Sequence, residues 1–92
     1  MSIAKWRNKI DEIDLKLLQL LNERAQCAIE IGHIKAKEKL PVHDPSREDK
    51  IIARLLKENT GPLSAPYLEK IYRTIIHKTR RTESEHSAEE IL

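Results

Sequence analysis

The sequence lacks several features that would assign it to other protein classes. It has no phenylalanine, one tryptophan and two tyrosines, so leucine and isoleucine must fill most of any core. It has no run of about 18 apolar residues, so we expect no membrane-spanning helix and no membrane partner. The N-terminus also lacks the apolar segment and small-residue cleavage site of a secretory signal. These absences predict a soluble protein located in the cytoplasm.

Cysteine and net charge are equally scarce. The single cysteine, Cys27, excludes an intramolecular disulfide. Because it lies among apolar positions of a predicted helix, we expect a buried, reduced thiol, in keeping with a reducing cytosol. Seventeen lysines and arginines nearly balance fifteen aspartates and glutamates, and the formal net charge of +2 predicts no nucleic-acid partner. The four histidines have no spacing typical of a metal site, so no metal is expected.

Few glycines and prolines interrupt the 92 residues, and the interruptions divide the chain into three predicted helices. The long helix spans 3–38, and Ser2 can cap its N-terminus. Asp44 and Pro45 begin a short helix, as an N-cap and a first helical position. A medium helix opens at Ser64. No strand-like alternation or internal repeat is present, so the predicted fold class is all-α.

The domain limits follow from where the apolar pattern ends. Residues 1–84 carry the helical pattern and form the predicted domain. Residues 85–92 have little to bury, and we expect them to form a disordered tail.

The length of the first helix predicts an assembly. At about 1.5 Å per residue it would be roughly 50 Å long, whereas a compact globule of this chain length is about 30 Å across. Leu15 and Leu18 lie off the main apolar seam, so the middle of the helix is apolar on more than one side. We therefore expect an intertwined homodimer in which the long helices cover one another. An extended coiled coil is the alternative, but charges interrupt its heptad pattern.

Charged residues interrupt the apolar stripe of the long helix at helical spacing. Arg7, Arg24 and Lys35 share one seam with core residues. A buried cation is costly unless it is paired, so Arg24 either pairs with a carboxylate such as Glu23 or Glu30, reaches solvent, or binds a ligand. The later helices add further polar groups to the same interior: Arg47, Glu48, Thr79 and Glu83. This cation-rich set suits a small ligand with two carboxylates, because arginine binds carboxylates through paired hydrogen bonds.

Two segments, "RNKIDEIDLKLLQLLNER" and "IGHIKAKEKLPVHDPSRE", closely resemble the all-helical chorismate mutase family, the AroQ class. The resemblance extends from about Lys5 to Glu83. It includes the arginine before "IDEID", the arginine that closes "LLNER", the lysine after "IGHI" and the "DPSRE" turn. It implies an intertwined dimer with two active sites, each enclosed mostly by one chain and completed by Arg7 of the other. The implied reaction is the Claisen rearrangement of chorismate to prephenate, which uses no cofactor, metal or covalent intermediate.

The resemblance also implies a role for each site residue. Arg24 and the partner's Arg7 would bind the two substrate carboxylates, and Lys35 would donate to the ether oxygen and a neighbouring carboxylate. Supporting roles would fall to Arg47 near the carboxylates, Glu48 as acceptor for the ring hydroxyl, and Asp44 and Thr79 as residues that position the ring. Such a site would hold a flexible dianion in its reactive conformer and place donors where charge develops.

Glu83 departs from one common family pattern, in which a glutamine donates a second hydrogen bond to the ether oxygen. A carboxylate cannot donate, so Glu83 must be protonated to take this role. We therefore predict activity that is highest below neutrality and declines as Glu83 ionises. The alternative is an exposed residue on the last turn of the helix.

Two other functions stay open. Isochorismate pyruvate lyase shares the implied scaffold and lysine, although the intact "DPSRE" turn favours the mutase. A dimeric binding module would instead use the cations of "HKTRR", residues 77–81, but this segment is short, lacks aromatic residues and is typical of a helix C-terminus. The enzyme is favoured if Arg24 and Lys35 lie beside a small-anion pocket. The sequence also leaves open whether the chain works alone, as part of a larger aromatic-biosynthesis enzyme, or under a regulatory partner.

Overall fold

The computed structural model describes the backbone of residues 2–91 and the side chains of residues 2–86. Helix α1 spans Ile3–Glu38, α2 spans Pro45–Glu58 and α3 spans Ala65–Ile91. Within the described residues there is no strand, so the predicted all-α fold with a long, a short and a medium helix is confirmed. Among these same residues, no helix is both long and apolar enough to cross a membrane.

Local signals set the first two helices, as predicted. Ser2 Oγ accepts a hydrogen bond from the Lys5 backbone N–H at 3.2 Å and caps α1. The same helix ends at Lys39, which adopts the left-handed conformation common after a helix, with φ 58°. Asp44 Oδ1 accepts from the Arg47 backbone N–H at 3.1 Å and caps α2. The segment between α1 and α2 is therefore held at both ends.

The sequence suggested that the third helix ends near Ser84, but the helix continues to Ile91. The reason is that residues 85–91 contain neither proline nor glycine, so nothing local stops the helix. The side chains of residues 87–91, together with all of Met1 and Leu92, lie outside the described part. The division into a domain at 1–84 and a tail at 85–92 stays a prediction.

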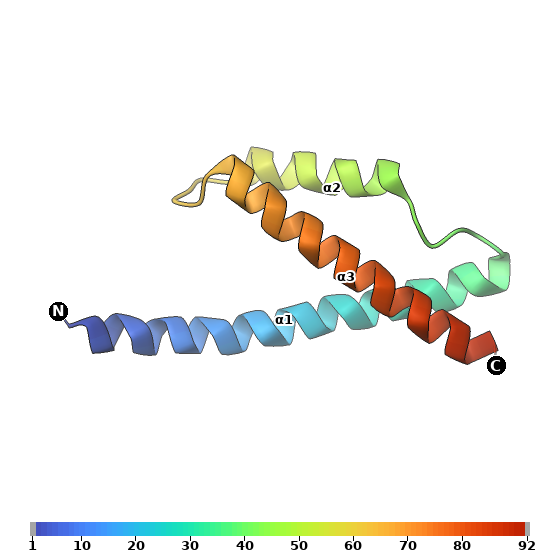
Figure 1. The fold of residues 1–92 in the computed structure, drawn as a ribbon, viewed down its shortest axis with the longest axis horizontal. Helices are drawn as coiled ribbons and strands as arrows, with labels where there is room; N and C mark the ends of the chain where they lie inside the picture. Colours follow the sequence, from blue (N-terminus) through green and yellow to red (C-terminus); the bar gives the residue numbers. More distant parts are fainter. Residues whose placement is uncertain (1, 92) are drawn as a thin grey trace.

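Helix α3 joins the other two helices. It crosses the C-terminal half of α1, and α2 packs along its first half (Figure 1). One isoleucine from each helix is buried: Ile29 on α1, Ile52 on α2 and Ile76 on α3. This small core holds the start of α2 and the second half of α3 next to the C-terminal half of α1.

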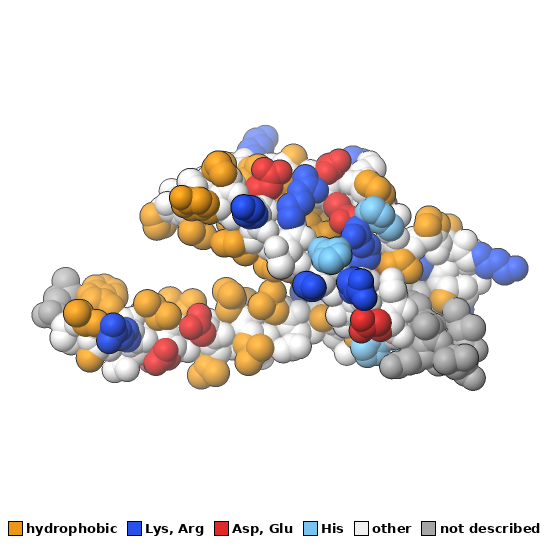
Figure 2. All heavy atoms as spheres, in the orientation of Figure 1, with side chains coloured by type: hydrophobic (Ala, Val, Ile, Leu, Met, Phe, Trp, Pro, Cys, Tyr) orange, Lys and Arg blue, Asp and Glu red, His pale blue; other side chains and the backbone are white. Residues whose placement is uncertain are grey.

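The N-terminal half of α1 has apolar side chains that its own chain leaves uncovered, and they line the arm that extends from the body (Figure 2). The exposed large apolar residues here are Ile3, Trp6, Ile10, Ile13, Leu15, Leu17, Leu18, Leu20 and Leu21. Their exposed fractions run from 38% to 70%. The radius of gyration is 16.4 Å, against about 12 Å for a compact domain of this length. A single chain therefore leaves half of α1 without a packing partner.

Candidate active site

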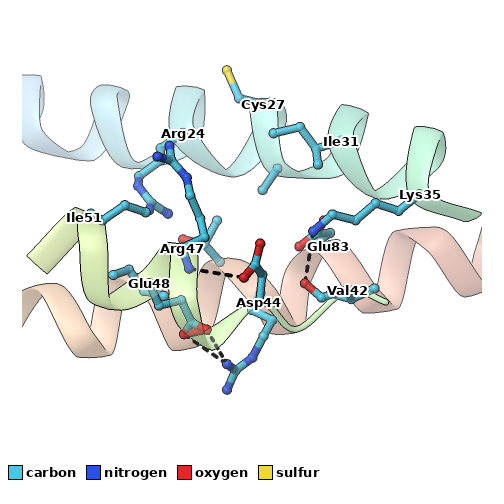
Figure 3. Close-up of a pocket in the computed structure, with 14 residues that line it drawn as sticks. Arg24, Cys27, Ile31, Lys35, Val42, Asp44, Arg47, Glu48, Ile51 and Glu83 are labelled. Carbon is cyan, nitrogen blue, oxygen red and sulfur yellow. Dashed lines mark hydrogen bonds and ion pairs between the residues drawn. The ribbon is translucent and has the colours of Figure 1, made fainter. Parts of the chain in front are cut away.

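A pocket of about 270 Å³ lies between the C-terminal half of α1, the start of α2 and the second half of α3 (Figure 3). Its apolar lining is Cys27, Ala28, Ile31, Val42, Ile51 and Ile76. Its polar lining is Arg24, Lys35, Asp44, Arg47, Glu48, Thr79, Arg80 and Glu83. The structure thus brings together every site residue predicted from the sequence except Arg7, and it adds Arg80.

Helical spacing explains how α1 forms one wall of this pocket. Arg24, Ala28, Ile31 and Lys35 follow one another in steps of three and four residues and so share a face. Arg24 and Lys35 lie at opposite ends of that wall (Figure 3), roughly 16 Å apart along the helix axis. The wall therefore offers a cation at each end and an apolar surface between them.

Lys35 is held in place by two groups. Its Nζ donates to the Val42 backbone carbonyl at 3.1 Å and lies 3.6 Å from Glu83 Oε1. An ammonium group has three N–H donors, and the hydrogen bond to Val42 uses one of them, so two remain for a ligand. The link to Val42 also ties the segment between α1 and α2 back onto α1.

Glu83 is buried in the pocket, with 6% of its surface exposed. The alternative of an exposed residue on the last helical turn is therefore wrong, because α3 continues beyond it and α1 covers it. Its Oε1 accepts no hydrogen bond from any described residue. A buried polar atom left without a hydrogen bond costs about 1–3 kcal/mol, so this oxygen is a candidate contact for a polar ligand.

Arg24 and Arg47 bring free guanidinium groups to the site. Neither guanidinium forms a hydrogen bond or ion pair with another side chain among residues 2–86. The expected alternative, in which Arg24 pairs with a neighbouring glutamate, does not occur: Glu23 accepts from Gln19 at 3.5 Å and Glu30 accepts from Gln26 at 2.9 Å. Two arginines on different helices thus line one pocket with their donors available to an anion.

Asp44 and Thr79 have structural hydrogen bonds but keep acceptor capacity. One Asp44 oxygen caps α2, which leaves the other for a ligand. Thr79 is 9% exposed, and its hydroxyl donates to the Ile75 carbonyl at 2.6 Å. The lone pairs of that hydroxyl can still accept a hydrogen bond from a ligand hydroxyl.

Arg80 is the pocket residue that the sequence analysis missed. Its Nη1 donates to both oxygens of Glu48, at 3.0 and 2.8 Å. The prediction that "HKTRR" forms a helix C-terminus is wrong, because α3 continues beyond it. The available signal was spacing: Ile76, Thr79, Arg80 and Glu83 share one helical face.

Two other residues differ from expectation or lie outside the pocket. Cys27 is exposed in the single chain, so the prediction of a buried thiol is wrong. Its side chain borders the pocket, but its sulfur points away from the other labelled side chains (Figure 3). Arg7 lies about 25 Å from Arg24 along α1, too far for its own pocket. Within the described side chains, no group of three or more His, Cys, Asp or Glu could hold a metal ion.

Comparison with known proteins gives consistent matches. Residues 6–84 match the family described as chorismate mutase type II. The chain is 46% identical over 78 residues to a bifunctional chorismate mutase/prephenate dehydratase of Aquifex aeolicus, an alignment that covers 80% of this chain and 22% of that protein. It is 44% identical over 55 residues to a chorismate mutase of Methanocaldococcus jannaschii, covering 60% of this chain and 56% of that protein. The chain thus spans only part of the curated relatives that it matches.

Solved structures with the same fold also match. A chorismate mutase (Form II) from Thermus thermophilus has a TM-score of 0.88 and 32% identity, covering 89% of this chain and 93% of that one. A chorismate mutase from Helicobacter pylori, solved in complex with prephenate, has a TM-score of 0.84 and 27% identity, covering 91% of each chain.

Proposed function

This chain belongs to the chorismate mutase type II family, and we propose that it rearranges chorismate to prephenate in the pocket between α1, α2 and α3. The observation that carries the proposal is the pair of arginines, Arg24 and Arg47, whose guanidinium groups line that pocket without a protein partner among the described side chains. Chorismate carries two carboxylates, and arginine binds carboxylates through strong, directional hydrogen bonds. The similar protein from Helicobacter pylori was solved with prephenate, the product of this reaction.

The reaction is intramolecular, so the site needs no nucleophile. Its task is to hold a flexible dianion in the compact conformer that reacts and to stabilise the charge that develops on the ether oxygen. Arg24 binds a substrate carboxylate, with Arg47 in support. Lys35 donates to the ether oxygen through an N–H that its hydrogen bond to Val42 leaves free, and the Glu83 carboxylate beside it helps to hold the ammonium in position.

The carboxylates of the pocket take the remaining roles. Glu83 donates the second hydrogen bond to the ether oxygen in its protonated form, and its burial in the pocket supports a contact with the ligand. Glu48 accepts from the ring hydroxyl, while Asp44 and Thr79 position the ring.

The catalytic unit we propose is an intertwined homodimer in which Arg7 acts in trans. The uncovered apolar half of α1 supports this proposal, because exposed apolar patches of this kind mark interfaces. In a two-fold dimer the same contact occurs twice, so each chain would give its Arg7 to the other's pocket. A cytoplasmic location, in which Cys27 stays reduced, belongs to the same proposal.

Offering chorismate and isochorismate separately to the purified chain tests the function. We expect chorismate to disappear and prephenate to form, with little pyruvate released from isochorismate. Release of pyruvate from isochorismate without rearrangement of chorismate would support the lyase instead. Conversion of neither compound, together with binding of nucleic acid, would support the binding module.

A further inference from the structure

Arg80 lines the pocket, yet the proposed rearrangement gives it no role. We propose that Arg80 is a positioning residue: it orients and neutralises the Glu48 carboxylate so that Glu48 can accept from the substrate hydroxyl without repelling the dianionic substrate. This inference rests on the proposed function, because it takes Glu48 to be the acceptor for the ring hydroxyl.

The contact between these two residues joins two helices inside the site. Glu48 lies in the first turn of α2, and Arg80 lies on α3. Arg80 Nη1 donates to Glu48 Oε1 at 3.0 Å and to Oε2 at 2.8 Å. The side chains of Arg80 and Glu48 are 25% and 17% exposed, respectively, so solvent screens this pair less than a surface pair. A charge-assisted contact of this kind fixes the carboxylate more firmly than packing alone.

The remaining acceptor capacity of Glu48 follows from its contacts. Each carboxylate oxygen can accept about two hydrogen bonds. Oε2 contacts both Arg80 and, at 3.1 Å, His43 Nε2, whereas Oε1 contacts only Arg80 among the described side chains. Oε1 is therefore the oxygen left to accept from a ligand.

The negative charge of the pocket carboxylates gives a second reason for pairing Arg80 with Glu48. Three carboxylates, Asp44, Glu48 and Glu83, line a pocket that is proposed to bind a dianion. Lys35 lies beside Glu83, and Arg80 lies against Glu48. Without Arg80, the Glu48 carboxylate would repel the substrate and lose its fixed orientation, so KM would rise and kcat would fall.

A second pair provides a matched control. Arg73 also links α3 to α2, through Asp49 at 3.0 Å, but neither residue lines the pocket and both are well exposed. The hydrogen bond to Asp49 raises the pKa of Arg73 above its ordinary value. Arg73→Ala therefore removes an interhelical ion pair without touching the site, and Arg81→Ala removes a cation next to Arg80.

A double-mutant cycle tests the inference, with circular dichroism to check folding. We expect Arg80→Ala to lower kcat/KM on chorismate roughly tenfold or more, as loss of a charge-assisted contact does. In a Glu48→Ala background the same change should have little further effect, because no carboxylate remains to be held. Arg80→Lys should restore much of the activity, since a single nitrogen makes both contacts. Arg73→Ala and Arg81→Ala should retain the wild-type kcat/KM.

Several outcomes would overturn the inference. An active Arg80→Ala variant would do so, as would equal losses from Arg80→Ala with and without Glu48, because Arg80 would then act on the substrate itself. A loss of the same size in Arg73→Ala would show that the effect is structural. If Arg80→Ala does not fold, the cycle with Arg80→Met, which keeps the length of the side chain but cannot donate, decides by the same criteria. A wild-type chain that leaves chorismate unchanged refutes the proposed function, whereas an active wild type with an unaffected Arg80→Ala refutes this inference alone.

Discussion

The two halves of α1 differ in what they present to their surroundings. The C-terminal half, from Arg24 to Lys35, packs against α3, and its inward stripe carries cations into a pocket. The N-terminal half, from Ile3 to Leu21, is apolar on more than one side and is uncovered. Two of the three cations on the stripe, Arg24 and Lys35, lie where the chain encloses it, whereas Arg7 lies among exposed apolar residues where the chain leaves it uncovered. This contrast supports the proposal that the C-terminal half binds a ligand and the N-terminal half binds a second chain.

The largest expected effect comes from a substitution in the C-terminal half of α1, which lines the pocket. Lys35→Ala should lower kcat/KM on chorismate by about a hundredfold to a thousandfold, as removal of one donor to a developing oxyanion does in other enzymes. The fold should survive, because the lost contacts of Lys35 are to one carbonyl and one carboxylate. Steady-state kinetics measure the loss, and Lys37→Ala, exposed on the same last turn of α1, is the control. Comparable kinetics for these two variants would remove Lys35 from the mechanism.

The next largest effect comes from a substitution in the N-terminal half of α1, which the chain leaves uncovered. Leu17 is 51% exposed in the single chain, and Leu17→Glu would place an unpaired charge in the proposed dimer interface, where burial of such a charge is costly. We expect the variant to be monomeric by light scattering after size-exclusion chromatography, with most of its activity lost. Lys16→Glu, a neighbouring exposed change, should leave the dimer intact. A monomeric wild type, or a dimeric and active Leu17→Glu variant, would contradict the role of this half.

The smallest expected effect concerns Glu83, which lines the pocket from α3. A carboxyl donates a hydrogen bond only when protonated, whereas a glutamine amide donates at any pH. We therefore expect Glu83→Gln to have a kcat/KM on chorismate at least equal to that of wild type, and Glu83→Ala to lose activity a few fold. Steady-state kinetics of the three chains measure the differences. Equal activity of Glu83→Ala and wild type would remove Glu83 as a donor.

Features set by neighbouring residues could be predicted from the sequence. The caps at Ser2 and Asp44 set the starts of α1 and α2, and the resulting helical spacing places Arg24 and Lys35 on one face. Local propensity and spacing are enough for such features. The resemblance to a known family supplied the site roles that spacing could not.

Features that depend on distant contacts could not be predicted. Arg80 and Glu48 are 32 residues apart, so no local pattern reveals that they pair. Cys27 looked buried because its neighbours in sequence are apolar, but exposure depends on which side of α1 the other helices cover. Arg7 illustrates the same limit, since its proposed pocket belongs to another chain.

Mixing two inactive variants tests the contrast between the halves most directly. Arg7→Ala removes the arginine in the uncovered N-terminal half of α1, and Arg24→Ala removes the arginine at the pocket. Homodimers of either variant should therefore have little activity. After unfolding and refolding together, about half of the dimers should combine one chain of each kind, and each of these should contain one intact site, giving roughly a quarter of wild-type activity. This recovery is the result the account predicts. A mixture no more active than the average of the two variants would contradict it, because both arginines would then serve the same chain.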